Sequence, residues 1–119
     1  MEVLDEQLLN EMTQIGSYDD YVIYVRSKEG PIPHVHIVDK QTLGYKYNCC
    51  VRLDEPMYFS HGSKQDTLNS KAKKEFIKFI TEKNDEFELM NWEVAVRLWN
   101  ISNPDFKIRG VSLPDYTRL

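Results

Sequence analysis

Three stretches of β-forming residues decide the fold of this chain: YVIYVR at 21–26, PHVHIV at 33–38 and YKYNCCVRL at 45–53. Each is rich in β-branched or aromatic residues, and the turn-forming stretch KEGP at 28–31 separates the first two. Such short connections favour an antiparallel meander, because parallel neighbours need crossovers of roughly a dozen residues or more. A shorter extended piece at 57–59 follows Pro56. The sequence therefore predicts a small antiparallel sheet of three to four strands over residues 20–62.

Helices are predicted on both sides of this sheet. Apolar residues at 3, 4, 8, 9 and 12 recur near helical spacing, which predicts a short N-terminal helix over residues 1–16. A pair of C-terminal helices is predicted over 69–101, and the residues from 102 to 119 are expected to pack as an extended tail. Together these elements predict one α+β domain spanning residues 1–119.

The two C-terminal helices have recognisable start signals. Asn69 or Ser70 can cap the first helix, whose body is predicted over 71–83. Asp85 can cap the second, with Glu88 three residues later as in a capping box. That helix is predicted from 86 to about 100, with a buried stripe and two flanking tryptophans that we interpret as core or interface residues: Phe87, Met90, Val94, Ala95, Leu98, Trp92 and Trp99.

Composition narrows the function classes. The 119 residues suit one globular domain, and a net charge of −4 makes nucleic acid an unfavourable partner. We expect no membrane span and no signal peptide, hence a cytoplasmic protein. The only cysteines are the neighbours Cys49 and Cys50, which point to opposite faces of a strand and are expected to stay reduced.

The two histidines at 34 and 36 are the most distinctive residues for chemistry. Because side chains alternate along a strand, His34 and His36 share one face, opposite Val35 and Ile37. Two imidazoles so placed can be metal ligands, or a ligand and a general base, and can also be half-exposed residues with a purely structural role. A third metal ligand must come from elsewhere, and the candidates are His61, Asp54, Glu55 and Asp39. A divalent metal held by His34, His36 and His61 is therefore one hypothesis, beside a protein without a cofactor.

The strand at 45–53 supplies polar neighbours for the histidines. Its even positions Lys46, Asn48 and Arg52 are predicted to share a solvated face with His34 and His36, forming a binding surface suited to an anion or simply keeping the sheet soluble. Cys50 lies on the same face, where it could be a nucleophile activated by a histidine or a small filler of the sheet.

The histidine strand resembles one found in a family of small bacterial proteins of unknown function. That family has a Pro-Pro-His-Val/Phe-His-Val strand after a first strand and a short turn. The matching residues here are Pro33, His34, Val35, His36 and Ile37, with Ile32 standing between two prolines. Family members are often encoded beside toxin–antitoxin or other mobile-element modules.

Two functions follow as expectations. The first is a small non-enzymatic binding or regulatory protein of a phage, toxin–antitoxin or defence-related system. It would act through contacts with a protein partner, and that partner could be a second copy of the chain. The alternative is a metal-dependent hydrolase or nuclease built on His34 and His36.

Overall fold

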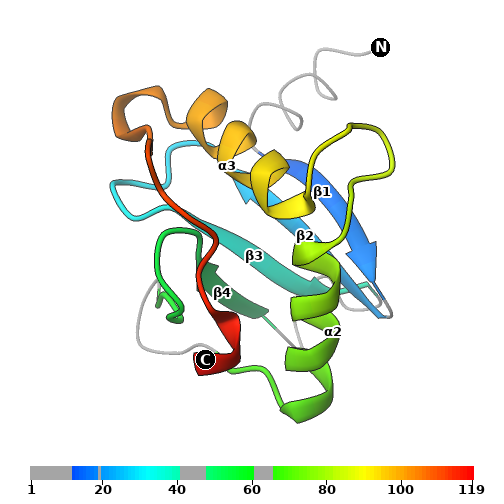
Figure 1. Cartoon of the computed structure of the whole chain (residues 1–119). Coiled ribbons are helices and arrows are strands. Elements are labelled where there is room, and N and C mark those ends of the chain that lie inside the picture. The colour runs from blue at the N-terminus through cyan, green and yellow to red at the C-terminus, as the bar shows by residue number, and fades with distance from the viewer. Residues whose placement is uncertain (1–11, 19, 41–47, 61–65) are drawn as a thin grey trace.

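The computed structural model of the chain describes residues 12–18, 20–40, 48–60 and 66–119. Four strands, β1 (Met12–Tyr18), β2 (Tyr21–Arg26), β3 (His34–Asp39) and β4 (Asn48–Arg52), form one antiparallel sheet in the order β1-β2-β3-β4. Helices α2 (Ser70–Thr81) and α3 (Asn91–Ser102) follow and cover one face of this sheet (Figure 1). The predicted α+β fold with an antiparallel sheet and two C-terminal helices is therefore confirmed.

The predicted strands at 21–26 and 33–38 agree with β2 and β3, and the described part of the third strand is β4. Residues 45–47 lie outside the described residues. The extended piece at 57–59 follows the edge of β4: Tyr58 forms an isolated bridge with Val51, and Phe59 N–H donates to Cys50 O at 2.9 Å.

The predicted N-terminal helix is wrong over residues 12–16, because this stretch belongs to β1. Its residues 1–11 lie outside the described residues. Helical periodicity is a local signal, whereas β1 owes its conformation to pairing with β2, from Met12 opposite Arg26 to Tyr18 opposite Tyr21. The register shifts between Gln14 and Gly16, so that Ile15 is the extra residue of a β-bulge.

Helix α2 begins where its start signal predicts. Asn69 is the N-cap, and its Oδ1 accepts a hydrogen bond from Ala72 N–H at 2.8 Å. The buried stripe of the helix consists of Ala72, Phe76, Phe79 and Ile80.

Helix α3 begins five residues later than predicted, at Asn91 instead of residue 86. Asp85 is not its cap, because Asn84 Oδ1 accepts the backbone N–H groups of Glu86 and Phe87 at 2.9 and 3.2 Å and holds this stretch as a turn. The cap is Met90, whose N–H donates to Glu93 Oε1 at 3.1 Å. Phe87 consequently lies outside the helix and is 52% exposed, whereas it was predicted to be buried.

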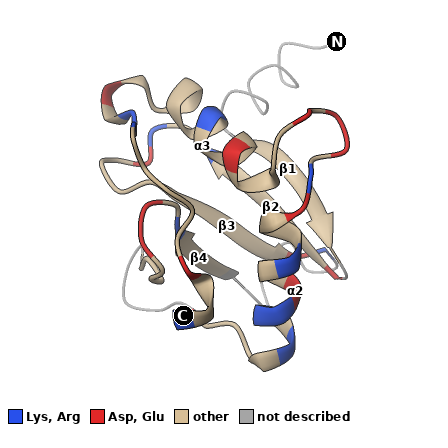
Figure 2. Cartoon of the chain, in the orientation of Figure 1, with Lys and Arg blue, Asp and Glu red and all other residues tan. Residues whose placement is uncertain are grey.

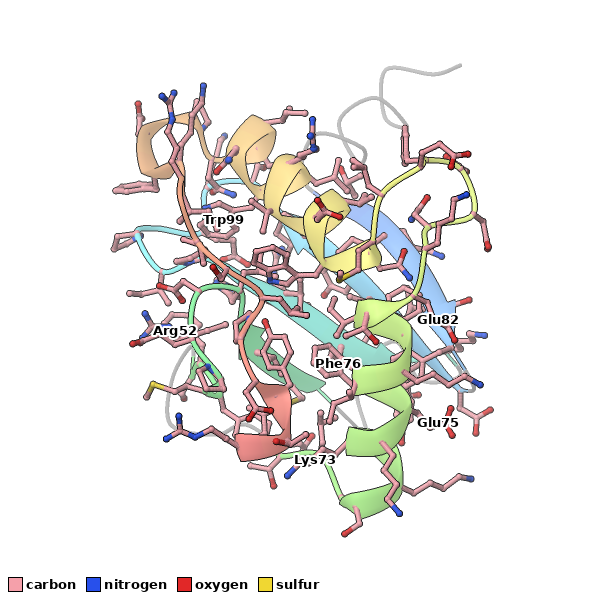
Figure 3. The ribbon with its side chains drawn as sticks, in the orientation of Figure 1. Arg52, Lys73, Glu75, Phe76, Glu82 and Trp99 are labelled. Atoms are coloured by element: carbon pink, nitrogen blue, oxygen red, sulfur yellow. The ribbon has the colours of Figure 1, made fainter. Side chains whose placement is uncertain are left out.

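The core lies between the helices and the sheet, where Phe76 and Trp99 are fully buried (Figure 3). Trp92 is also buried and donates its indole N–H to Leu53 O at 3.0 Å, so both tryptophans are core residues as interpreted. The tail is not simply extended, since it contains two short 3-10 helices, Pro104–Phe106 and Tyr116–Arg118. Tyr116 anchors it, with its hydroxyl donating to Arg52 O at 2.6 Å. No helix among the described residues is long and apolar enough to cross a membrane.

Gly16 allows the sheet to approach α2 closely, which gives a test of this packing. A Cβ at Gly16 would lie 2.8 Å from Cζ of Phe79, whose ring stacks on Tyr18 at 5.6 Å and cannot retreat freely. We expect Gly16→Ala to lower the free energy of unfolding by about 1–3 kcal/mol in urea denaturation, as overpacking typically does. The adjacent exposed variant Ser17→Ala should change it by less than about 0.5 kcal/mol. Adding Phe79→Leu should restore part of the free energy of unfolding that Gly16→Ala loses. A Gly16→Ala protein as stable as wild type would contradict the close contact between Gly16 and Phe79.

Candidate metal centre

The two histidines of β3 are buried, which corrects the expectation of a solvated face. His34 is 0% exposed and His36 is 3% exposed, although Val35 and Ile37 fill the core on the other side of the strand. Aromatic rings cover the imidazoles: Tyr24 stacks on His36 with ring centroids 5.0 Å apart, and Phe59 lies 4.5 Å from His34. The alternation placed these side chains on the correct face, but that face is closed in β3 and not open to water as in many antiparallel sheets.

The turn between β2 and β3 brings a carboxylate to the imidazoles. Glu29 Oε1 lies 2.5 Å from His36 Nε2 and 3.6 Å from His34 Nε2. Lys28 and Gly30 on either side adopt positive φ values of 59° and 81°, so the turn folds back over the start of β3. Asn103, after α3, fixes this turn, because its Oδ1 accepts from Glu29 N–H and its Nδ2 donates to Arg26 O, each at 3.0 Å.

Hydrogen bonds define which ring nitrogens can bind a metal. His34 Nδ1 lies 2.7 Å from Ile32 O, and because a carbonyl only accepts, Nδ1 carries the hydrogen and Nε2 is the potential ligand. In His36, Nε2–H donates to Glu29, and Nδ1 faces Cys50 Sγ at 3.4 Å. Histidine ligands in metal sites usually donate their second nitrogen to a carbonyl or carboxylate in this way.

Cys50 completes a compact set of three potential ligand residues. It lies opposite His36 in the β3–β4 register and is 4% exposed. One nitrogen of each imidazole and Cys50 Sγ all lie within 4.8 Å of one another. A tetrahedral zinc ion with bonds of about 2.3 Å to sulfur and about 2.0–2.1 Å to nitrogen separates those atoms by roughly 3.5 Å. The Sγ–Nδ1 distance of 3.4 Å already matches that edge.

The other predicted site residues are distributed differently. Arg52 lies opposite His34 in the register, but its guanidinium is bonded to Asp54 Oδ1 and Oδ2, each at 2.9 Å, and to Glu55 at 3.1 Å. Its charge is therefore already matched by carboxylates, which weakens the anion-site interpretation. Asn48 lies opposite Val38 at the far end of β4. Lys46 and His61 lie outside the described residues.

The sequence does not predict Cys50 or Glu29 as a metal ligand. Its patterns indicate a nucleophile or a small filler at Cys50 and a turn residue at Glu29. Period-two alternation places Cys50 on the same face as His36, but alternation alone does not specify the register that sets the two residues opposite each other. Glu29 carries no recognisable pattern, because its contact depends on the conformation of the turn.

Two contacts link three side chains in the order of a nucleophile, a base and an orienting carboxylate: Cys50, His36 and Glu29. Its environment opposes that role. Burial, reinforced by the negative charge of Glu29, raises the pKa of Cys50 from 9.0 to about 12. A thiol that stays protonated and is almost fully buried is a poor nucleophile, whereas a bound metal cation would deprotonate it. The arrangement therefore favours a ligand over a nucleophile.

Comparison of the chain with protein families, with curated proteins and with solved structures gives no match. The function must therefore be argued from the site itself.

Thiol reactivity tests the environment of the cysteines. Burial raises the pKa values of Cys49 and Cys50 to about 12, so both thiols are protonated at neutral pH. We expect the metal-free folded protein to react with a thiol reagent orders of magnitude more slowly than the urea-unfolded chain, because thiolate and access are both lacking. The pKa of each thiol is higher in the folded protein than in the unfolded chain. The contribution of the thiols to the free energy of unfolding is therefore fully present below about pH 9 and is lost as the pH approaches 12. Rapid labelling of Cys50 in the folded protein at neutral pH would contradict this account.

Proposed function

We propose that this protein is a small, non-enzymatic regulatory or binding protein that holds a divalent transition metal, best matched by zinc, through His34, His36 and Cys50. The observation that carries the proposal is the convergence of three buried ligand atoms within 4.8 Å. Nitrogen and sulfur donors together suit zinc, whereas magnesium and calcium prefer oxygen.

Burial favours the non-enzymatic function over the hydrolase or nuclease alternative. Catalytic zinc keeps a coordination position open to water and substrate, whereas structural zinc is enclosed by four protein ligands. The three ligand side chains here are at most 4% exposed. A closed site can stabilise or switch a fold but gives a substrate no path to the metal.

The fourth ligand has two candidates. Glu29 is hydrogen-bonded to His36 Nε2, on the opposite side of that ring from Nδ1, so it could contribute an oxygen only by giving up this bond; otherwise it remains the hydrogen-bond partner of His36. His61, the third ligand expected from the sequence, is the other candidate. Removing each side chain separately distinguishes them.

The position of Glu29 supports a regulatory role. Its turn is hydrogen-bonded to Asn103 at the end of α3, and the exposed apolar side chains of Ile101 and Phe106 lie beside that residue in the sequence. Ordering the turn by a metal would thus stabilise a helix end that carries exposed apolar surface. A role in a phage, toxin–antitoxin or defence-related system, proposed from the resemblance of the histidine strand, would use such a surface for a protein partner.

The adjacent cysteines provide a matched pair of variants for testing the metal site. Cys50 belongs to the cluster, whereas Cys49 is buried in the apolar core on the opposite face. We expect the wild-type protein to bind one zinc ion per chain and to show a thiolate-to-metal charge-transfer band with cobalt. Cys50→Ala should abolish the band and weaken zinc binding at least about tenfold, and Cys49→Ala should retain both. His34→Ala and His36→Ala should weaken binding similarly.

Circular dichroism of each variant tests whether it is folded. A variant that keeps the wild-type spectrum but loses zinc affinity has lost the metal site and not the fold. Glu29→Gln and His61→Ala identify the fourth ligand by whichever lowers the zinc affinity. Equal zinc affinity in Cys50→Ala and wild type would refute the metal proposal. Metal-dependent cleavage of a phosphodiester or ester that disappears in His36→Ala would instead establish the enzymatic alternative.

A further inference from the structure

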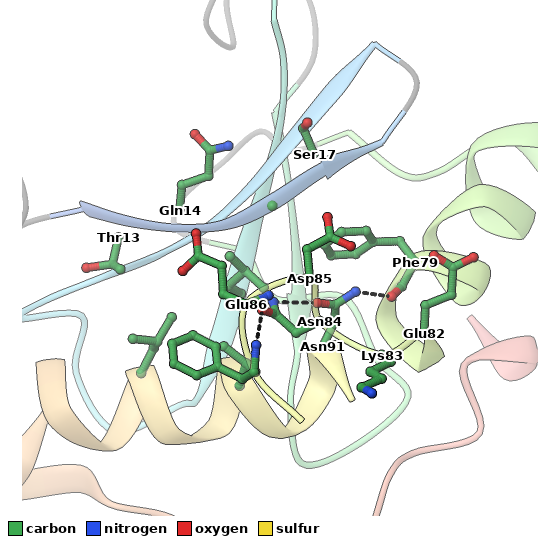
Figure 4. A pocket seen from close by; sticks show the side chains of 15 residues that line it. Thr13, Gln14, Ser17, Phe79, Glu82, Lys83, Asn84, Asp85, Glu86 and Asn91 are labelled. Carbon is green, nitrogen blue, oxygen red and sulfur yellow. Dashed lines mark hydrogen bonds between the residues drawn. The ribbon is translucent and has the colours of Figure 1, made fainter. Parts of the chain in front are cut away.

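A second feature is a cavity of about 630 Å³ between β1 and the connection from α2 to α3 (Figure 4). It is separate from the histidine cluster, which consists of His34, His36 and Cys50 with Glu29 beside them. Its volume is within the range of roughly 300–1,000 Å³ that is typical of ligand sites. Five consecutive residues of β1, 13–17, form one wall. Phe79, Val94 and Leu98 contribute apolar surface, and residues 82–87 form the opposite wall.

Hydrogen bonds hold the second wall in place without a ligand. Asn84 Nδ2 donates to Asn91 Oδ1 at 2.8 Å, and Asn91 Nδ2 donates to Phe79 O at 2.7 Å. The backbone is closed by Asn84 N–H to Leu89 O at 2.7 Å and by the isolated bridge between Lys83 and Met90. Both asparagines are buried, so the wall is organised before anything binds.

The rim of the cavity is acidic. Glu82, Asp85 and Glu86 line it, and all three are exposed. The basic lining residue Lys83 is paired with Glu88 at 2.5 Å. Figure 2 shows acidic residues gathered on the loop between α2 and α3, beside β1. This rim selects a positively charged partner and repels a second copy of a chain whose net charge is −4.

The shape of the first wall specifies an extended partner. β1 is an edge strand of the described sheet, and its residues 14–17 run along the cavity. Extended peptides bind edge strands through main-chain hydrogen bonds, with side-chain pockets supplying specificity. The exposed ring of Phe87 offers an apolar contact for such a side chain. The bulge at Ile15 interrupts the regular edge, so only a short segment can pair and sheet-to-sheet aggregation is opposed.

We propose that this cavity is a docking groove for a short, extended, lysine- or arginine-rich segment of a partner protein. The segment lies along β1, with its basic side chains over Glu82, Asp85 and Glu86. The groove does not use the histidine cluster, so this inference stands or falls independently of the metal.

The test uses the full chain and a synthetic peptide in which lysine alternates with valine. Titration followed by NMR should shift backbone signals of 13–17 and 84–87, and affinity should fall as salt is added. A paired substitution, Asp85→Lys with Glu86→Lys, should weaken binding at least about tenfold because it reverses the charge of the rim. The control Asp105→Lys changes an exposed acidic residue outside the groove and should leave the affinity within about twofold.

Three further probes can overturn the proposal. A glutamate–valine peptide should not bind, and equal binding would remove the charge argument. An N-methylated lysine–valine peptide should bind at least about tenfold more weakly, because it cannot donate main-chain hydrogen bonds to β1, and equal binding would overturn the proposed pairing. If spermidine shifts the same NMR signals and binds as tightly as the peptide, the groove takes a small polycation instead of a protein segment.

Discussion

The burial of two imidazoles on β3 is the constraint on which the surrounding structure depends. Buried polar groups destabilise a fold unless each finds a hydrogen-bond partner. His34 uses Ile32 O, and His36 uses Glu29 on one side and Cys50 on the other. These partners require the turn after β2 to fold back and β4 to adopt one register. That turn is itself held by Asn103 at the end of α3. The partners of the histidines therefore link the sheet to the helix layer.

Helix α3 is the element common to both proposed sites. Its start contributes Asn91 to the groove wall, and Asn103, the residue that ends it, holds the turn of Glu29. This helix of twelve residues thus contacts the groove beside β1 at its start and, through Asn103, the turn of Glu29 at its end. A ligand at one site shifts the other only if it changes the position of this helix, since coupling requires an element with two arrangements. The hydrogen bonds of Asn91 and Asn103 are the contacts through which such a change would pass.

Local signals predicted the parts of the fold that local physics determines. Runs of β-forming residues bounded by turn signals predicted β2, β3 and β4, and Asn69 marked the start of α2. The parts that depend on distant partners were missed. β1 exists through its pairing with β2, and the start of α3 is delayed because Asn84 binds the backbone that Asp85 was expected to cap. The histidine cluster shows the same division: the shared face followed from spacing, whereas Glu29 joins through a turn and Cys50 through register.

Compensation of the thiolate charge is a second physical reason to regard the cluster as a cation site. A carboxylate and a thiol lie together in a nearly dry environment, where burial and then the negative charge of Glu29 raise the pKa of Cys50, partly offset by the positive charge of Arg26. A protonated thiol tolerates this, but only as a weak hydrogen-bond donor. A divalent cation would compensate the charge of the Cys50 thiolate and use the imidazoles as neutral ligands, while Arg26 Nε already lies 3.9 Å from Glu29 Oε1. Because uncompensated buried charge is costly and paired charge is tolerated, the same residues that make a poor nucleophile would suit a zinc ion as ligands.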